Sequence, residues 1–177
     1  LAQHWVKRPG TNWRYVAQWD QWMRWTGDHW EQEKKKGAIE LARNITREVL
    51  MWPGLTPAAK LRVNSARTAH AMLTFVRSDT AIASIPEQYD TNSNLLGVPN
   101  GQIDLETCKY VEAERGAYIT KQCLVAPRGG AATTWSNFLQ TVTAGNQDVI
   151  NYLQRFAGYS LSGHTSEHAL AFLYGTG

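Results

Sequence analysis

The residues at the C-terminal end of the sequence have the types and spacing of the start of a phosphate-binding loop. Residues 169–174 form an uninterrupted apolar run, which is typical of a buried parallel strand, and Gly175-Thr176-Gly177 follow it directly. Flexible glycines let several backbone N–H groups face phosphate oxygens. The lysine and Ser/Thr that complete such a loop are not in the sequence. We therefore expect Gly175 and Gly177 to be nucleotide-binding positions of an incomplete loop, and we expect this chain neither to bind nor to hydrolyse ATP.

A second set of candidate residues is cationic and suits the phosphates of nucleic acid. The formal net charge is only +3, but residues 1–77 hold 13 Lys and Arg against 6 Asp and Glu, whereas residues 78–177 hold 5 against 9. A basic half favours nucleic acid, because each neutralised phosphate releases counterions. A solvated surface of mixed charge is the alternative. The candidate DNA-binding residues are Lys34, Lys35, Lys36, Arg43, Arg47, Lys60, Arg62 and Arg67.

Metal and acid–base chemistry have weaker candidates. The two cysteines lie 15 residues apart without a CxxC pair, and the five histidines lack the HExxH and CxxH spacings. His164 and His168 are four apart, which suits one helical face, but no third ligand lies close in sequence. Glu112 and Glu114 have the spacing of one strand face, with no base or metal motif nearby. We predict no metal site and no catalytic residue, and we interpret these side chains as surface.

Tryptophans are concentrated between residues 12 and 31. Short aromatic and β-branched runs separated by turn residues predict a small antiparallel meander there, with Thr26-Gly27-Asp28 as a hairpin turn. We interpret most of the tryptophans as core, since each buries a large area at little entropic cost. A stacking platform for single-stranded bases and a sugar-binding face are the alternatives. The tryptophans are Trp13, Trp19, Trp22, Trp25 and Trp30.

Two helices are predicted after the meander, and they carry most of the candidate cations. Residues 37–50 place apolar side chains at helical spacing, with two arginines on another face. Thr56 as N-cap and Pro57 at the first helical position predict a second helix that reaches about Arg77. Its inward positions are predicted to be Leu61, Ala69, Leu73 and Val76.

Short strands and then helices are predicted for the rest of the chain. The tight turn at residues 99–102 predicts an Asn-Gly hairpin, and residues 118–125 predict a further strand. Helices resume near Trp135 and again after Asn146, which is the expected N-cap of a helix ended by Gly158. The predicted fold class is α+β in one compact unit: an N-terminal Trp-rich β-meander, two basic amphipathic helices, central short strands with the Asn-Gly hairpin, and a C-terminal helical segment.

Two patterns are specific in combination: PNGxxDLxT at residues 99–107 and LQRxxGYxLxG at residues 153–163. With residues 22–30, 135–139 and 172–177, they resemble, over nearly the whole chain, the region just upstream of the superfamily 3 helicase motor in phage and plasmid primase-helicases. That domain is shared with the poxvirus primase-helicase.

The resemblance implies two parts, an accessory, collar-like domain at residues 1–168 and the start of a truncated ATPase domain at residues 169–177, whose phosphate loop begins at Gly175 and Gly177. It implies DNA replication as the process, with DNA and the downstream ATPase domain of the same polypeptide as partners. It further implies a hexameric ring for the full-length protein. ATP and magnesium are then cofactors of the parent protein, with none in this chain. The sequence departs from the family at Cys108-Lys109, where many relatives have glycine, and it contains no Walker B carboxylates or arginine finger.

We expect a noncatalytic accessory domain of a replicative primase-helicase that helps a ring to assemble and guides DNA toward the motor. The alternatives are the N-terminal segment of an ATP-dependent DNA helicase with no separate binding role, and an unrelated Trp-rich glycan-binding module. Salt-sensitive DNA affinity separates the first reading from the last. The longest apolar run is about a third of a membrane span, so no membrane partner is expected. With no secretory signal, we expect a cytoplasmic location, in the host if a phage or plasmid encodes the protein.

Overall fold

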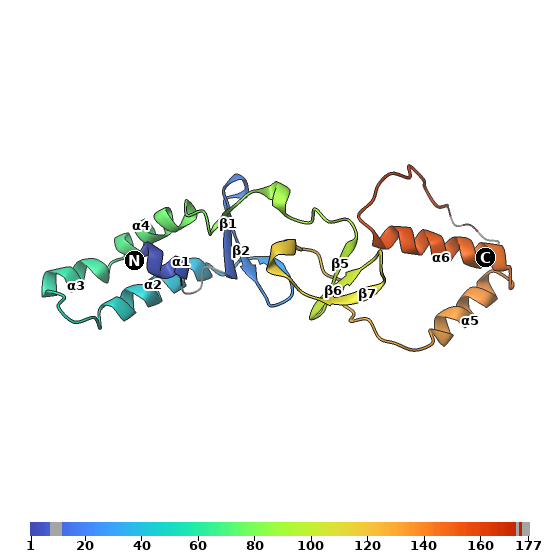
Figure 1. The fold of residues 1–177 in the computed structure, drawn as a ribbon, viewed down its shortest axis with the longest axis horizontal. Helices are drawn as coiled ribbons and strands as arrows, with labels where there is room; N and C mark the ends of the chain where they lie inside the picture. Colours follow the sequence, from blue (N-terminus) through green and yellow to red (C-terminus); the bar gives the residue numbers. More distant parts are fainter. Residues whose placement is uncertain (8–11, 173, 175–177) are drawn as a thin grey trace. The chain divides into compact units, whose positions relative to one another are not determined.

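The computed structural model describes residues 1–7, 12–172 and 174, and it has the mixed α+β composition predicted from the sequence (Figure 1). The chain divides into two compact units. Unit 1 comprises Leu1–Thr91 and Ala113–Lys121, and unit 2 comprises Asn92–Glu112 and Gln122–Gly177. The expectation of one compact unit is therefore wrong. Most of the buried apolar side chains belong to unit 1.

The predicted Trp-rich meander forms a sheet in unit 1. Strands β1 (Trp13–Val16), β2 (Gln21–Trp25) and β3 (Trp30–Gln32) pair antiparallel in sequence order. A short strand, β4 (Ala83–Ser84), adds to the other edge of β1 in parallel, which gives the order β3-β2-β1-β4. Gly27 lies in the loop between β2 and β3 with a φ of 119°, a left-handed conformation that glycine adopts at little cost. The predicted hairpin turn is confirmed.

Unit 1 also contains four α-helices among its described residues. They are α1 (Ala2–Lys7), α2 (Gly37–Val49), α3 (Pro57–Val63) and α4 (Ala66–Arg77). The predicted helix over residues 37–50 is confirmed as α2. The second predicted helix is instead two helices, α3 and α4.

The break between α3 and α4 has a local cause at Ser65. The Ser65 hydroxyl accepts a hydrogen bond from the backbone N–H of Thr68 at 3.2 Å and donates one to the carbonyl of Arg62 at 2.7 Å, so it caps a new helix. The interruption changes which side of the chain faces the core. Leu61, predicted to point inward, is 78% exposed. The inward positions predicted on α4 are confirmed, since Ala69, Leu73 and Val76 are buried.

Two apolar clusters hold unit 1 together. The larger joins α1, α2 and α4 to β1, and the smaller lies around Trp30, next to Tyr89 and Tyr118. Trp13 and Trp30 are buried, and Trp22 and Trp25 are partly buried against these clusters, so the core interpretation is confirmed for them. Trp19 differs, because 42% of its surface is exposed. The larger cluster contains Trp5, Trp13, Tyr15, Ala38, Ala42, Ile45, Val49, Ala69, Met72, Leu73, Val76 and Ile82.

Unit 2 contains a separate antiparallel sheet. Its strands are β5 (Leu95–Val98), β6 (Gly101–Asp104) and β7 (Lys109–Glu112), in that order. The predicted hairpin at residues 99–102 is confirmed as the connection of β5 to β6. Asn100 is in the left-handed conformation at a φ of 67°, and Gly101 is already the first residue of β6. Strand β7 was not predicted from the sequence.

The strand predicted over residues 118–125 does not form. Tyr118 has a left-handed φ of 50°, which interrupts an extended backbone, and Gly97 and Gln122 make only an isolated bridge. The physical reason is topological. The chain leaves unit 1 after Lys121 and enters unit 2 at Gln122, so the two halves of this segment belong to different units.

Both predicted C-terminal helices are present, as α5 (Thr133–Val142) and α6 (Gln147–Leu161). Asn146 caps α6, since its side-chain oxygen accepts from the backbone N–H groups of Asp148 at 3.1 Å and Val149 at 3.3 Å. The helix does not end at Gly158, because that glycine does not have the left-handed φ of a helix terminator and the helix continues to Leu161.

The buried strand predicted at residues 169–174 is wrong for the part of it that the structure describes. Residues 169–172 and 174 are irregular, and Leu170, Phe172 and Tyr174 are 81–91% exposed. A buried strand needs hydrogen-bonded neighbours, and no described strand pairs with this segment. Gly175 and Gly177, the predicted nucleotide-binding positions, lie outside the described residues. Among the described helices, none has the length and apolar character to cross a membrane.

Candidate nucleic-acid interface

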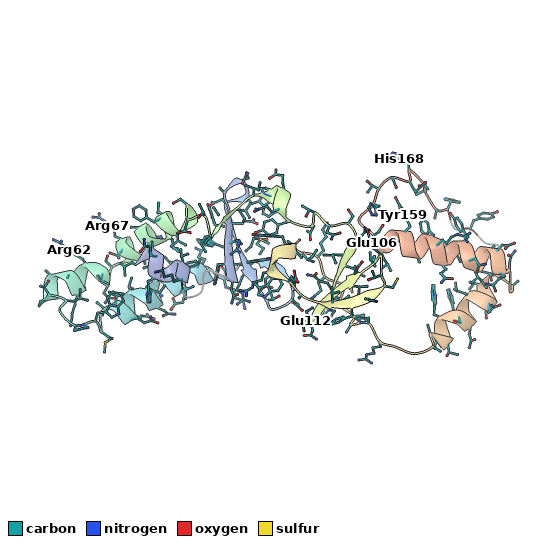
Figure 2. All side chains as sticks on the ribbon, viewed as in Figure 1. Arg62, Arg67, Glu106, Glu112, Tyr159 and His168 are labelled. Carbon is teal, nitrogen blue, oxygen red and sulfur yellow. The ribbon has the colours of Figure 1, made fainter. Side chains whose placement is uncertain are left out.

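The eight predicted DNA-binding residues all lie in unit 1, and all are exposed. Three precede α2, two are on α2, two on α3 and one on α4. Figure 2 shows Arg62 on α3 and Arg67 on α4, at the helices that the prediction joined into one. In order along the chain these are Lys34, Lys35, Lys36, Arg43, Arg47, Lys60, Arg62 and Arg67.

A groove between α2 and α4 brings two of these residues together. It has a volume of about 330 Å³, and Arg43 and Arg47 line it from α2, opposite His70 of α4. Its other polar lining comes from Thr46, Asn64 and Ser65, over an apolar floor that includes Ile39 and Ala69. Sequence reasoning missed His70. Its position three residues after Arg67, on the same face of a helix, was the available signal.

A single carboxylate holds both arginines of this groove. Glu40 accepts from Arg43 Nη1 at 2.8 Å and from Arg47 Nη1 at 3.5 Å, and Asn44 Oδ1 accepts from Arg47 Nη1 at 3.0 Å. The arginine side chains are 54% exposed and Glu40 is 50% exposed, so these ion pairs contribute less than about 1 kcal/mol each. The groove therefore has oriented guanidinium groups that an incoming anion can engage.

The other candidate cations are in a strongly basic setting. Residues 34–77 contain nine Lys and Arg against two carboxylates, Glu40 and Glu48, a net charge of +7. In the part of the chain that the structure describes, Lys60, Arg62 and Arg67 make no ion pair. Their positive charge is therefore not compensated by direct contacts within unit 1.

Lys34 and Lys35 lie in a different groove from Arg43 and Arg47. This second groove, of about 470 Å³, is also lined by Arg24 and by the acidic residues Glu31 and Glu33. Arg24 donates to Glu31 at 2.7 Å. The structure thus distributes the predicted patch over two grooves and the exposed surface of α3 and α4, and does not gather it into one site.

The weaker candidates of unit 2 have ordinary surroundings. His164 shares a hydrogen bond of 2.9 Å with Asn94, and it lies in the irregular segment after α6, not on a helix. His168 lies in the same segment (Figure 2). Glu112 is exposed at the end of β7, and Cys108 and Cys123 are free thiols. Over the described residues, no three potential metal ligands of the His, Cys, Asp and Glu types gather.

The described part of the chain is thus a mixed α+β structure in two units, with a basic helical region. The family described as "D5 N terminal like" matches residues 2–144, which is most of the chain. The chain belongs to this family, the domain that lies N-terminal to the superfamily 3 helicase motor in phage, plasmid and poxvirus primase-helicases. The resemblance inferred from the sequence is confirmed. No curated protein is similar enough to the chain to count as a match.

Proposed function

We propose that unit 1 binds the sugar–phosphate backbone of DNA, as the noncatalytic accessory part of a replicative primase-helicase. The observation that carries the proposal is the groove between α2 and α4, where Arg43, Arg47 and His70 converge. Membership of the family supports the proposal, because the family's domain lies N-terminal to a helicase motor in primase-helicases and a helicase acts on DNA. The basic region would then contact the strand that the motor moves.

The chemistry of the groove suits a phosphate group. A guanidinium group presents N–H donors in a planar fork that matches two oxygens of one phosphate. Glu40 keeps Arg43 and Arg47 on the same side of α2, which lowers the entropic cost of engaging both. The exposed Lys60, Arg62 and Arg67 add long-range attraction, so the expected binding is independent of sequence and sensitive to salt.

Neutralising the arginines of the groove tests the proposal. In R43Q/R47Q, we expect the affinity for a DNA oligonucleotide to fall about tenfold at low salt. The plot of the logarithm of the association constant against the logarithm of the salt concentration should become less steep, by up to the slope that two phosphate contacts contribute. Fluorescence anisotropy over a salt series measures both. The matched control is K109Q/R155Q, which removes the same charge from unit 2. Equal binding by wild type and a folded R43Q/R47Q would overturn the proposal.

The apolar faces of α5 and α6 support a second part of the proposal, a role in ring assembly. Trp135 and Phe138 stack at 5.5 Å between ring centroids, yet they are 56% and 51% exposed, and Val142 and Tyr152 are exposed by more than half. Surfaces of this kind mark contacts with other proteins. We propose that a neighbouring copy covers them once the ATPase domain is attached, in a hexamer.

Sedimentation of two polypeptides tests the assembly role. We expect monomers of this chain and hexamers of a longer chain that includes the ATPase domain, because weak contacts multiply around a closed ring. W135A/F138A in the longer chain should weaken the hexamer. A stable hexamer of this chain alone would contradict the proposal that assembly requires the ATPase domain.

We propose that ATP and magnesium bind to the ATPase domain and not to this chain. Titration calorimetry of this chain with ATP should therefore show no heat of binding.

A further inference from the structure

A third groove of unit 1 is used by none of the functions proposed above. It has a volume of about 580 Å³ and opens beside β2 and β3, the strands of the Trp-rich meander. Its lining combines aromatic, amide and hydroxyl groups, the side-chain types that contact nucleobases. The lining residues are Trp19, Gln21, Met23, Trp30, Glu31, Gln32 and Thr120.

Trp19 is the exposed aromatic residue of this groove, and buried rings support it. Its ring lies 5.5 Å from that of Tyr89, which in turn meets Tyr118 edge-on at 5.2 Å. Tyr118 stacks on the fully buried Trp30 at 5.9 Å. The 42% exposure of Trp19 is therefore not the result of a loose side chain. An indole that is packed against another ring on one side and exposed to solvent on the other is a suitable surface for stacking of a second aromatic ring.

Polar groups with open hydrogen-bonding capacity surround the indole. Within the described residues, the side-chain amides of Gln21 and Gln32 make no hydrogen bond, so both can donate to and accept from a ligand. Thr120 is held by Asp90, whose carboxylate accepts from the Thr120 backbone N–H at 2.7 Å and from its hydroxyl at 2.5 Å. A base edge carries the same mixture of donors and acceptors as a glutamine amide.

The Trp19 groove adjoins the groove that Lys34 and Lys35 line together with Arg24, Glu31 and Glu33. Glu31 and Gln32 of strand β3 line both grooves. The carboxylate of Glu31 is paired with Arg24 at 2.7 Å, so its charge repels a phosphate less than a free carboxylate would. A strand that places a base at Trp19 can therefore place an adjacent phosphate near the lysines.

We propose that the Trp19 groove takes one unpaired base of single-stranded nucleic acid, stacked on the indole, with the neighbouring phosphate at Lys34 and Lys35. The inference rests on the proposed function in that unit 1 must bind nucleic acid at all. It adds a preference for single strands, because the face of a base is covered by its neighbours in a duplex. Base stacking tolerates any sequence, so no sequence preference is expected.

The test compares a fluorescein-labelled twelve-residue oligothymidylate with a duplex of the same length. We expect W19A to weaken binding of the single strand about tenfold and to leave duplex affinity within about twofold. W19F keeps an aromatic ring and should restore most of the single-strand affinity. The control W52A removes a tryptophan that is 49% exposed in unit 1 but lies outside the Trp19 groove, and it should change neither affinity. Equal losses for both ligands in W19A, or no loss for either, would overturn the inference.

Two further measurements separate this inference from the proposed function. R43Q/R47Q should weaken both ligands; if it does while W19A has no effect, the backbone interface stands and the base site fails. If wild type binds neither ligand, both proposals fail together. Cellohexaose, a neutral sugar that can also stack on tryptophan, should leave the intrinsic fluorescence unchanged. Binding of cellohexaose that W19A abolishes, without binding of the oligothymidylate, would assign the groove to a glycan instead.

Discussion

Units 1 and 2 differ in how far the apolar faces of their amphipathic helices are buried. In unit 1, α2 and α4 bury their apolar faces in a common core with β1, and the large side chains of Trp5, Trp30 and Ile45 are almost wholly inaccessible. In unit 2, α5 buries only Leu139 among its apolar side chains, and no residue of α6 is buried. An amphipathic pattern therefore specifies a helix in both units, but it does not specify what covers the apolar face.

The contrast bears on how each unit is stabilised. Burial of apolar surface contributes about 25 cal/mol per Å², so unit 1 obtains most of its stability from its own core. The helices of unit 2 lack that contribution and depend more on local features such as the Asn146 cap. Substitutions should consequently have large effects in the core of unit 1 and small effects on α5 and α6.

The largest expected effect is that of Trp30→Ala. Trp30 is fully buried, its Nε1 donates to the carbonyl of Arg115 at 2.9 Å, and its ring stacks on Tyr118. We expect a loss of about 3–5 kcal/mol in the free energy of unfolding of unit 1. Trp135→Ala, the matched substitution on α5, should change stability by about 0.5 kcal/mol or less. Urea unfolding followed by near-UV circular dichroism measures both, and similar losses would remove the contrast between the units.

Gly101→Ala should have the next largest effect, and it acts on the β5–β7 sheet of unit 2. A Cβ at Gly101 would lie 2.4–2.6 Å from the Tyr110 ring and hydroxyl, and that hydroxyl donates to the Asn100 carbonyl at 2.5 Å. Displacing the ring costs about 1–2 kcal/mol. Hydrogen exchange of the backbone amides of β5–β7 measures this loss of stability as faster exchange.

Gly101→Ala combined with Tyr110→Ala tests whether the Tyr110 ring causes this loss of stability. With the ring gone, Gly101→Ala should cost much less, since the two residues are in contact and their effects are not additive. An undiminished cost in the double variant would show that the strain lies in the backbone and not in the Tyr110 contact.

Ser65→Ala tests whether a local cap also matters in the unit with the large core. Removing the hydroxyl that accepts from the Thr68 N–H should cost about 1 kcal/mol and loosen the first turn of α4. Thermal melting followed by far-UV circular dichroism measures the change. Ser136→Ala, in the exposed interior of α5, is the control and should be neutral or slightly stabilising. A larger effect at Ser136 would mean that α5 is better packed than described.

The smallest effect concerns pH and the turn between β6 and β7. The Thr107 hydroxyl and the backbone N–H of Glu106 donate to Asp104 and hold the pKa of its carboxyl below the ordinary value of about 3.9. A lowered folded-state pKa adds stability above about pH 4 that is lost as the pH falls through the folded value. Melting of Asp104→Asn between pH 6 and pH 3 should therefore show a slightly weaker acid dependence than wild type, and an unchanged dependence would contradict this.

The sequence predicted elements best where the signal was local. The Gly27 turn, the Asn100 turn, the Asn146 cap and helix α2 each depend on a few adjacent residues, and each is found. Predictions failed where a distant contact decides the outcome. Residues 118–125 were expected to form one strand, but their two halves belong to different units. Leu61 is a different case, because the Ser65 cap that divides the predicted helix is local and was not recognised in the sequence.

The candidate interface also combines features that the sequence predicts locally with features that depend on packing. Spacing located the cations on α2, α3 and α4, but their separation into grooves depends on how the helices pack, and His70 became relevant only because α4 faces α2. Cys108 has a left-handed φ of 54°, a conformation that glycine adopts most easily.

The return of Ala113–Lys121 to unit 1 also sets an order of events during synthesis. This segment supplies the Ile119 carbonyl that accepts from the Trp30 N–H at 2.8 Å and the Tyr118 ring that covers Trp30. It is translated after Asn92–Glu112, the part of unit 2 that contains strands β5, β6 and β7. On the ribosome, the edge of β3 therefore stays open while the β5–β7 sheet emerges, and unit 1 closes only when residue 121 has left the exit tunnel.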